Sequence, residues 1–122
     1  PAGRYSREVL QRLSADATLG ADFDRRVLAN VVSNEENAPA VVTRVQLGEA
    51  DAGMAYASDV APALRARVRA LEIPANANVE ARYLVAVLAG APNPSGARAV
   101  VDWLLSPAGQ KLLVDAAFSP AP

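Results

Sequence analysis

The residues best placed to do chemistry in this chain lie in the segment SNEENAP, residues 33–39, where a helix is about to begin. Ser33 and Glu36 match a capping box, in which side chains and backbone N–H groups satisfy one another at the start of a helix. A helix capped by Ser33 would, however, place Pro39 in its interior, where the proline ring costs roughly 3 kcal/mol. We therefore predict that the helix begins near residue 36, with Pro39 in its first turn and SNEE in the preceding loop.

The free N–H groups of this loop indicate an anion site. The N–H groups of residues 35–38 have no helical acceptor, and the positive end of the helix dipole lies behind them. The segment AYASD (residues 55–59) repeats the arrangement, with a strand expected to end near Tyr56 and a helix to begin near Ser58 or Asp59. Most helix openings bind only water or a capping side chain, so geometry alone leaves both interpretations open.

The residue types and spacings in this sequence give little support for catalysis. Glu35 and Glu36 could act as an acid–base pair, but neighbours in a loop point in different directions, and no nucleophile, phosphate loop or metal-ligand spacing accompanies them. The chain has no His and no Cys, which removes the commonest general base, the commonest metal ligand and any thiolate nucleophile. We therefore predict a binding protein rather than an enzyme, with no catalytic residue, no cofactor and no metal site.

The amino-acid composition further narrows the class of protein to which the chain can belong. The 122 residues suffice for one compact domain, and 52% apolar with 20% charged residues suits a soluble folded chain. With 12 Lys and Arg against 13 Asp and Glu, the chain lacks the basic surface of a nucleic-acid binder. No apolar run is long enough to span a membrane. Because the chain begins at Pro1 with neither an initiator Met nor a leader, we expect it to be a fragment of a longer protein.

The elements expected to position these groups alternate along the chain. Apolar periodicity, caps and turn signals predict helices over residues 4–14, 36–47 (closed by Gly48), 58–67, 97–105 and 106–117. Runs of β-branched or small apolar residues predict strands over residues 25–32, 51–58, 68–74 and 81–90. The alternation predicts an α/β layer fold with a mostly parallel sheet, and both helix openings would then meet at one sheet edge.

Three further features of the sequence are interpreted without a functional role. Arg65, Arg67 and Arg69 alternate, and we interpret them as a solvated strand face. Tyr83 opens the most strand-like run of the chain, and taken by itself it is a packing or edge tyrosine. Trp103 lies beside an apolar stripe and is expected to be a core or interface aromatic.

Several motifs, taken in order, resemble those of the periplasmic molybdate-binding proteins of ABC importers. They are PAGRY, then E-N before a helix that ends in GEADAG, the turn YASD, the run RYLVAV and the closing LSPAGQ helix. The resemblance covers nearly the whole chain and implies one lobe of a type II periplasmic-binding-protein fold. Residues 1–83 would form the second ligand-binding lobe. Residues 84–122 would form a returning strand and a C-terminal helix pair that packs on a first lobe absent from this chain.

The resemblance also implies a ligand and its contacts. Relatives hold a tetrahedral oxyanion with two backbone N–H groups, which align with Glu35 and Ala55, and with a tyrosine hydroxyl, which aligns with Tyr83. A site made only of donors suits molybdate or tungstate, which remain dianions at neutral pH, whereas a protonated phosphate would leave a buried O–H unpaired. Sulfate also has no proton that needs an acceptor, so a site made only of donors does not exclude it, and its exclusion must depend on the size of the anion. Metal would enter only within the oxyanion, and the Glu35 carboxylate must turn towards solvent, away from the anion.

The implied function is an extracytoplasmic solute-binding protein that delivers the oxyanion to an ABC permease. The implied location is periplasmic or extracellular, with a lipid anchor on the full-length protein as an open alternative. The alternatives are an effector-sensing domain of a transcriptional regulator with the same two-lobe architecture, or a binding protein for another oxyanion such as sulfate. Without a first lobe, we expect weak molybdate binding and self-association or repositioning through an apolar stripe of Val100, Val101, Leu104 and Leu105.

Overall fold

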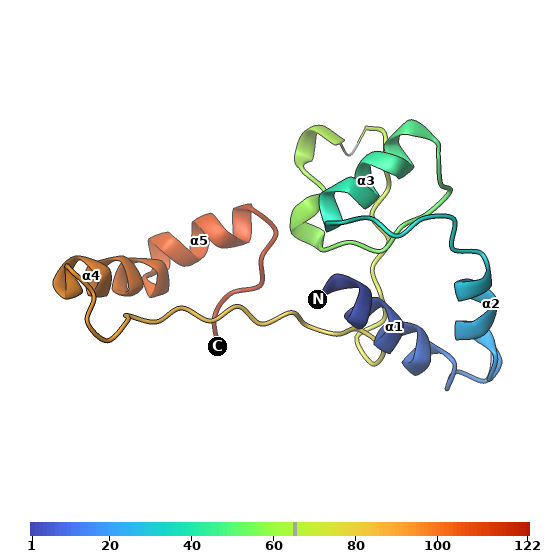
Figure 1. Ribbon diagram of the computed structural model, residues 1–122, viewed down its shortest axis with the longest axis horizontal. Coiled ribbons are helices and arrows are strands. Elements are labelled where there is room, and N and C mark those ends of the chain that lie inside the picture. Colours follow the sequence, from blue (N-terminus) through green and yellow to red (C-terminus); the bar gives the residue numbers. More distant parts are fainter. Residues whose placement is uncertain (65) are drawn as a thin grey trace. The chain divides into compact units, whose positions relative to one another are not determined.

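The computed structural model describes residues 1–64 and 66–122, so the predictions that involve Arg65 lie outside the described residues at that position. Within this range the regular structure consists of five α-helices and two short 3₁₀ turns (Figure 1). The chain divides into two compact units, Pro1–Ala81 and Arg82–Pro122.

The predicted α/β fold with a mostly parallel sheet is wrong, because the described residues contain no strand (Figure 1). Most of the segment 25–32 belongs to helix α2 (Phe23–Ala29), and the segments 51–58, 68–74 and 81–90 are irregular or form turns. A helix satisfies its backbone N–H and C=O groups locally, whereas a strand needs a second strand beside it. β-branched patterning identifies residues that suit a pleated surface, but it does not supply the partner strand.

Helices α1 (Ala2–Leu13) and α2 pack together in the first unit, and α1 confirms the predicted helix over residues 4–14. α1 buries Val9 and Leu10. At the end of α1, the Ser14 hydroxyl accepts a hydrogen bond from the Asp24 N–H at 3.0 Å, which joins the two helices. Arg12 donates to the backbone carbonyl of Asn78 at 2.5 Å, so α1 also holds the turn beside the buried Ala77.

Helix α3 (Ala38–Leu47) starts and ends as predicted. Asn37 is the N-cap, and its side chain accepts from the Ala40 N–H at 2.9 Å. Pro39 lies in the first turn, where its missing N–H has no helical acceptor to lose. Gly48 ends the helix in the left-handed conformation with φ 76°, which glycine adopts without the Cβ penalty of other residues. The match of Ser33 and Glu36 to a capping box is therefore accidental.

The segment after α3 packs closely against that helix. A Cβ on Gly53 would overlap Val41 Cγ1 and would lie 3.3 Å from Val45 Cγ2, so only glycine lets the backbone approach this face of α3. The predicted helix over residues 58–67 is replaced by 3₁₀ turns, η1 (Ala57–Asp59) and η2 (Pro62–Leu64), and η1 contacts α3. η2 begins at Pro62, and a proline is tolerated in the first turn of a helix but not in its interior.

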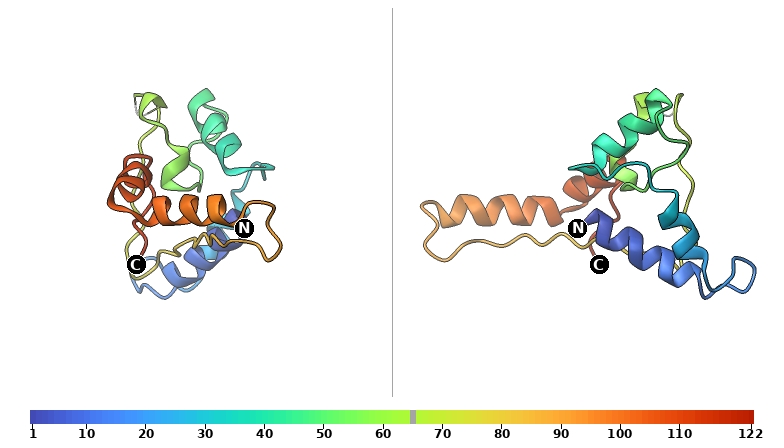
Figure 2. Two further views of the ribbon diagram at one scale, coloured as in Figure 1. Left: turned by 90° about the vertical axis from the view of Figure 1, so that its left-hand side faces the viewer. Right: turned by 45° about the vertical axis from the view of Figure 1, so that its right-hand side comes forward.

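The second unit contains helices α4 (Pro94–Leu105) and α5 (Pro107–Asp115), which follow one another directly (Figure 2). Ser106 between them caps α5, with Pro107 at the first helical position, as predicted. Its hydroxyl donates to the Trp103 carbonyl at 2.6 Å, and Gln110 Nε2 donates to the Leu104 carbonyl at 2.7 Å. These bonds satisfy C-terminal carbonyls of α4 and hold the start of α5 against its end.

Many large apolar side chains of the second unit are exposed. Leu84 in the segment before α4 is 96% exposed, which is unusual for a residue of the most strand-like run of the chain. The others include Val85, Leu88, Val100, Trp103, Leu105, Leu112 and Val114. Among the described helices, none has the length and apolar character needed to cross a membrane.

Candidate functional site

The loop before α3 carries the first predicted donor, the N–H of Glu35. Residues 32–36 take part in no backbone–backbone hydrogen bond among the described residues, so nothing in the backbone fixes this loop. Side chains hold it instead. Glu35 Oε1 accepts from the Ser33 hydroxyl at 2.5 Å and from Arg44 Nε at 3.0 Å.

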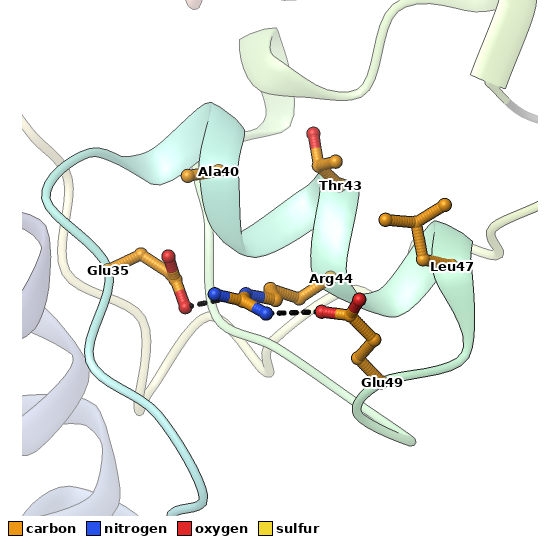
Figure 3. Close-up of a pocket in the computed structure, with 6 residues that line it drawn as sticks. All are labelled: Glu35, Ala40, Thr43, Arg44, Leu47 and Glu49. Atoms are coloured by element: carbon orange, nitrogen blue, oxygen red, sulfur yellow. Dashed lines mark hydrogen bonds and ion pairs between the residues drawn. The ribbon is translucent and has the colours of Figure 1, made fainter.

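Arg44 joins this loop to the residue that follows the helix. Its Nη1 donates to Glu49 Oε2 while its Nε donates to Glu35, so one guanidinium binds carboxylates from both ends of α3 (Figure 3). We call Ser33, Glu35, Arg44 and Glu49 the Arg44 network. The Glu35 carboxylate thus lies on Arg44 rather than turning to solvent as expected, and its side chain is only 16% exposed.

The Arg44 network shifts the pKa values of Glu35 and Arg44. The hydrogen bond from Ser33, and then the charge and hydrogen bond of Arg44, lower the pKa of Glu35 below its ordinary value against an opposing effect of burial. Glu49 and then Glu35 raise the pKa of Arg44. The Glu35 carboxylate is therefore ionised and paired at neutral pH.

A hollow of about 310 Å³ lies along the Arg44 network. Its lining residues are Glu35, Ala40, Thr43, Arg44, Leu47 and Glu49 (Figure 3). Its single cation is already bound by two carboxylates, so the hollow offers an anion no free positive charge. The predicted anion donors are backbone N–H groups rather than a cation of this kind.

The second predicted donor, the N–H of Ala55, lies on the segment that Gly53 brings against α3. Glu35 and Ala55 therefore both belong to segments that contact α3, one through Arg44 and the other through Gly53. Neither N–H donates to an acceptor within the described part of the chain. The turn that follows Ala55 is held by the Asp59 carboxylate, which accepts from the Tyr56 N–H at 2.9 Å.

The third predicted donor, Tyr83, belongs to the second unit, Arg82–Pro122. Its side chain is 70% exposed, and its ring meets Phe118 edge-on with the ring centroids 6.0 Å apart. The first unit therefore contains two of the three predicted donors, and the third lies on the other unit.

Sequence reasoning missed Arg44 and Glu49. Their separation of five residues is not a helical pair spacing, and Glu35 lies nine residues before Arg44. A signal existed in Gly48, whose left-handed turn reverses the chain so that the Glu49 N–H donates to the Arg44 carbonyl at 3.0 Å. Elsewhere, the described residues contain no group of three or more His, Cys, Asp or Glu side chains suited to a metal ion.

Comparison with known proteins places the chain in a family. A sequence profile of the bacterial extracellular solute-binding proteins matches residues 1–119. The chain belongs to that family. The resemblance found in the motif order is also supported, because the chain is 34% identical over 90 residues to proteins named molybdate-binding protein ModA from Mycobacterium bovis and Mycobacterium tuberculosis.

The match to these mycobacterial relatives covers 74% of this solute-binding chain but only 34% of each relative. The chain thus spans about a third of the length of the curated relatives that it matches. No solved structure gives a significant match.

The Arg44 network makes the loop of this solute-binding chain sensitive to acid. Because the pKa of Glu35 is lowered in the folded chain, its stabilising contribution is present above the ordinary glutamate pKa of about 4.3 and is lost as pH falls through the lower folded value. We expect the Ser33 and Glu35 amide NMR signals to shift in that acidic window. The Glu35 side-chain carboxyl signal gives its pKa directly, and Glu35→Gln is the control that should abolish the transition. A Glu35 carboxyl that titrates at or above the ordinary value would contradict the network.

Proposed function

We propose that this chain is the second lobe and returning segment of a binding protein that captures molybdate or tungstate and delivers it to an ABC importer. The observation that carries the proposal is the likeness to two proteins named for molybdate binding, over a region that includes the loop before α3 and the GEADAG segment after it. The proposed role is binding without catalysis, in the periplasm or at the outer surface of the cell.

The proposed ligand contacts are the N–H groups of Glu35 and Ala55 and the hydroxyl of Tyr83. Two facts support the first pair. Both N–H groups lack an acceptor within the described residues, and the segments that carry them both contact α3. The N-terminus of α3 also contributes a positive partial charge close to Glu35, two residues before the Asn37 cap. Neutral donors of this kind suit a fully ionised tetrahedral dianion.

We further propose that residues 1–83 form the lobe, which adds Arg82 and Tyr83 to the first compact unit, and that residues 84–122 pack on a first lobe outside this chain. The exposure of Leu84, Val100 and Leu105 supports this division, because such side chains stabilise a protein only when another surface covers them. The first lobe would complete the ligand shell from the opposite side.

The test is a titration of the two-lobe protein with molybdate, tungstate, sulfate and phosphate. We expect 1:1 binding of the first two anions and weaker binding of the others. Tyr83→Phe removes one hydrogen bond to a charged ligand and should weaken molybdate binding by about tenfold or more, because such bonds contribute roughly 1.5–3 kcal/mol. Tyr5→Phe, on α1, is the matched control and should bind like the parent. An unchanged affinity for Tyr83→Phe would remove this residue from the site, and no response to any anion would reject the proposed function.

The exposed apolar side chains of the second unit also predict self-association of the chain in isolation. Val100, Leu105 and Leu112 are all more than half exposed on α4 and α5, so burying them against a second copy is favourable by about 25 cal/mol per Å². Light scattering over a range of concentrations should show a mass above 12.7 kDa that rises with concentration. Val100→Ser combined with Leu105→Ser should shift the chain towards the monomer. A monomer at all concentrations would contradict the prediction.

A further inference from the structure

Arg44 contacts both segments that flank α3. Its Nε lies 3.0 Å from Glu35 Oε1 in the loop before the helix, and its Nη1 binds Glu49 Oε2 just after the helix (Figure 3). The guanidinium is a rigid fork with donors in fixed directions, so two carboxylates bound to it are held at a fixed separation. No other described arginine binds two carboxylates.

The loop depends on this contact more than a surface ion pair would suggest. Isolated exposed ion pairs contribute little to stability, but several charges that form a network are an exception. Residues 32–36 have no backbone–backbone hydrogen bond among the described residues. The Glu35 carboxylate accepts from Ser33 within the loop and from Arg44 on α3, so the bond from Arg44 connects the loop to the helix.

The charge of the Arg44 network matters for an anion nearby. With Arg44 in place, Glu35 and Glu49 leave one net negative charge, and without it they leave two. Glu35 is also the residue whose N–H is proposed to contact the oxyanion. The carboxylate and the proposed ligand-binding N–H belong to the same residue, so an unpaired Glu35 carboxylate would repel a bound dianion.

We propose that Arg44 is a positioning residue of the anion site. It holds the Glu35 carboxylate on the flank of α3, which neutralises that carboxylate and leaves the N–H of the same residue free for the ligand. The hydroxyl of Thr43, the neighbour of Arg44 on α3, instead donates to the Pro39 carbonyl, and among the described residues the Glu35 carboxylate accepts only from Ser33 and Arg44. The role in ligand binding rests on the proposed function, whereas the role in holding the loop rests on the contacts alone.

The first arm of the test needs no ligand. In Arg44→Gln, NMR relaxation should show lower order parameters for the backbone of residues 33–36, and the pKa of the Glu35 carboxyl should rise towards its ordinary value. Arg26→Gln is the matched control, because Arg26 also pairs with a carboxylate, Asp22, but on α2. It should leave residues 33–36 unchanged. A loop in Arg44→Gln with parental order parameters and a parental Glu35 titration would overturn the inference.

The second arm measures molybdate affinity in the two-lobe protein by calorimetry. Arg44→Gln should weaken binding by about tenfold, the effect of one unpaired charge close to a dianion in a partly aqueous setting. Adding Glu35→Gln to that variant removes the unpaired charge but does not restore the bond that holds the loop. It should therefore recover the electrostatic part of the lost affinity, which a merely structural role of Arg44 would not produce. A double variant as weak as Arg44→Gln would overturn the electrostatic role. If the parent binds no oxyanion, the proposed function fails together with the ligand role of Arg44, and the first arm alone decides whether Arg44 holds the loop.

Discussion

Replacing Gly109 by alanine is expected to separate helices α4 and α5 and to lower the free energy of unfolding of the second unit by about 2–3 kcal/mol. Gly109 is buried in the first turn of α5, where a Cβ would lie 2.8 Å from the Cα and the carbonyl oxygen of Leu104 and would overlap the carbonyl oxygen of Trp103. These are backbone atoms at the end of α4, so no rotation of a side chain can make room. The helices must move apart, which also breaks the bond from Gln110 to the Leu104 carbonyl.

Amide hydrogen exchange of α4 and α5 measures this effect for the second unit alone. The matched control is Gly3→Ala, another glycine within a helix, where nothing lies within 4 Å of the added Cβ. That variant should be neutral or should stabilise α1 by about 0.5–1 kcal/mol through helix propensity. Unchanged exchange protection in Gly109→Ala would show that the contact between the two helices is looser than the structure places it.

The second large effect concerns ligand affinity. We expect the isolated chain to bind molybdate at least about 100-fold more weakly than the two-lobe protein, or not measurably. A second lobe that supplied only two further hydrogen bonds to the charged ligand would already contribute roughly 3 kcal/mol, and every 1.4 kcal/mol is a factor of ten in affinity. With one lobe, water remains on the open side of the oxyanion and the proposed donors act in a higher effective dielectric constant, where each is weaker.

Calorimetric titration of the isolated chain and of the two-lobe protein with molybdate, under one buffer and salt concentration, checks this expectation. Sulfate serves as the control anion for both. Tight 1:1 binding by the isolated chain would contradict the prediction. It would also mean that the N–H groups of Glu35 and Ala55 suffice with Tyr83, so the proposed division of the ligand shell between two lobes would have to be abandoned.

Local sequence features determined much of the helical structure. The Asn37 cap, Pro39 in the first turn and Gly48 at the end of α3 lie within a few residues of the groups that they satisfy. The same holds for Ser106 and Pro107 at the start of α5. The order of the motifs also indicated the family, which the match over residues 1–119 bears out. These features were readable because each depends on contacts between near neighbours in the chain.

Only the tertiary structure decided that the described residues form no sheet and which residues surround Glu35. The runs around residues 25–32 and 81–90 have the residues of strands, but strand pairing is non-local and the described residues provide no partner. Likewise, the resemblance predicted an anion-binding N–H at Glu35, but the sequence could not show which residue its carboxylate contacts. Arg44 binds the Glu35 carboxylate, although the two residues are nine positions apart in the sequence, and it also binds Glu49. Both contacts form because the loop before α3 and the turn at Gly48 bring the two flanking segments to one guanidinium. The sequence alone determined caps and helices, since these form between near neighbours, and tertiary folding decided every contact between residues distant in the chain.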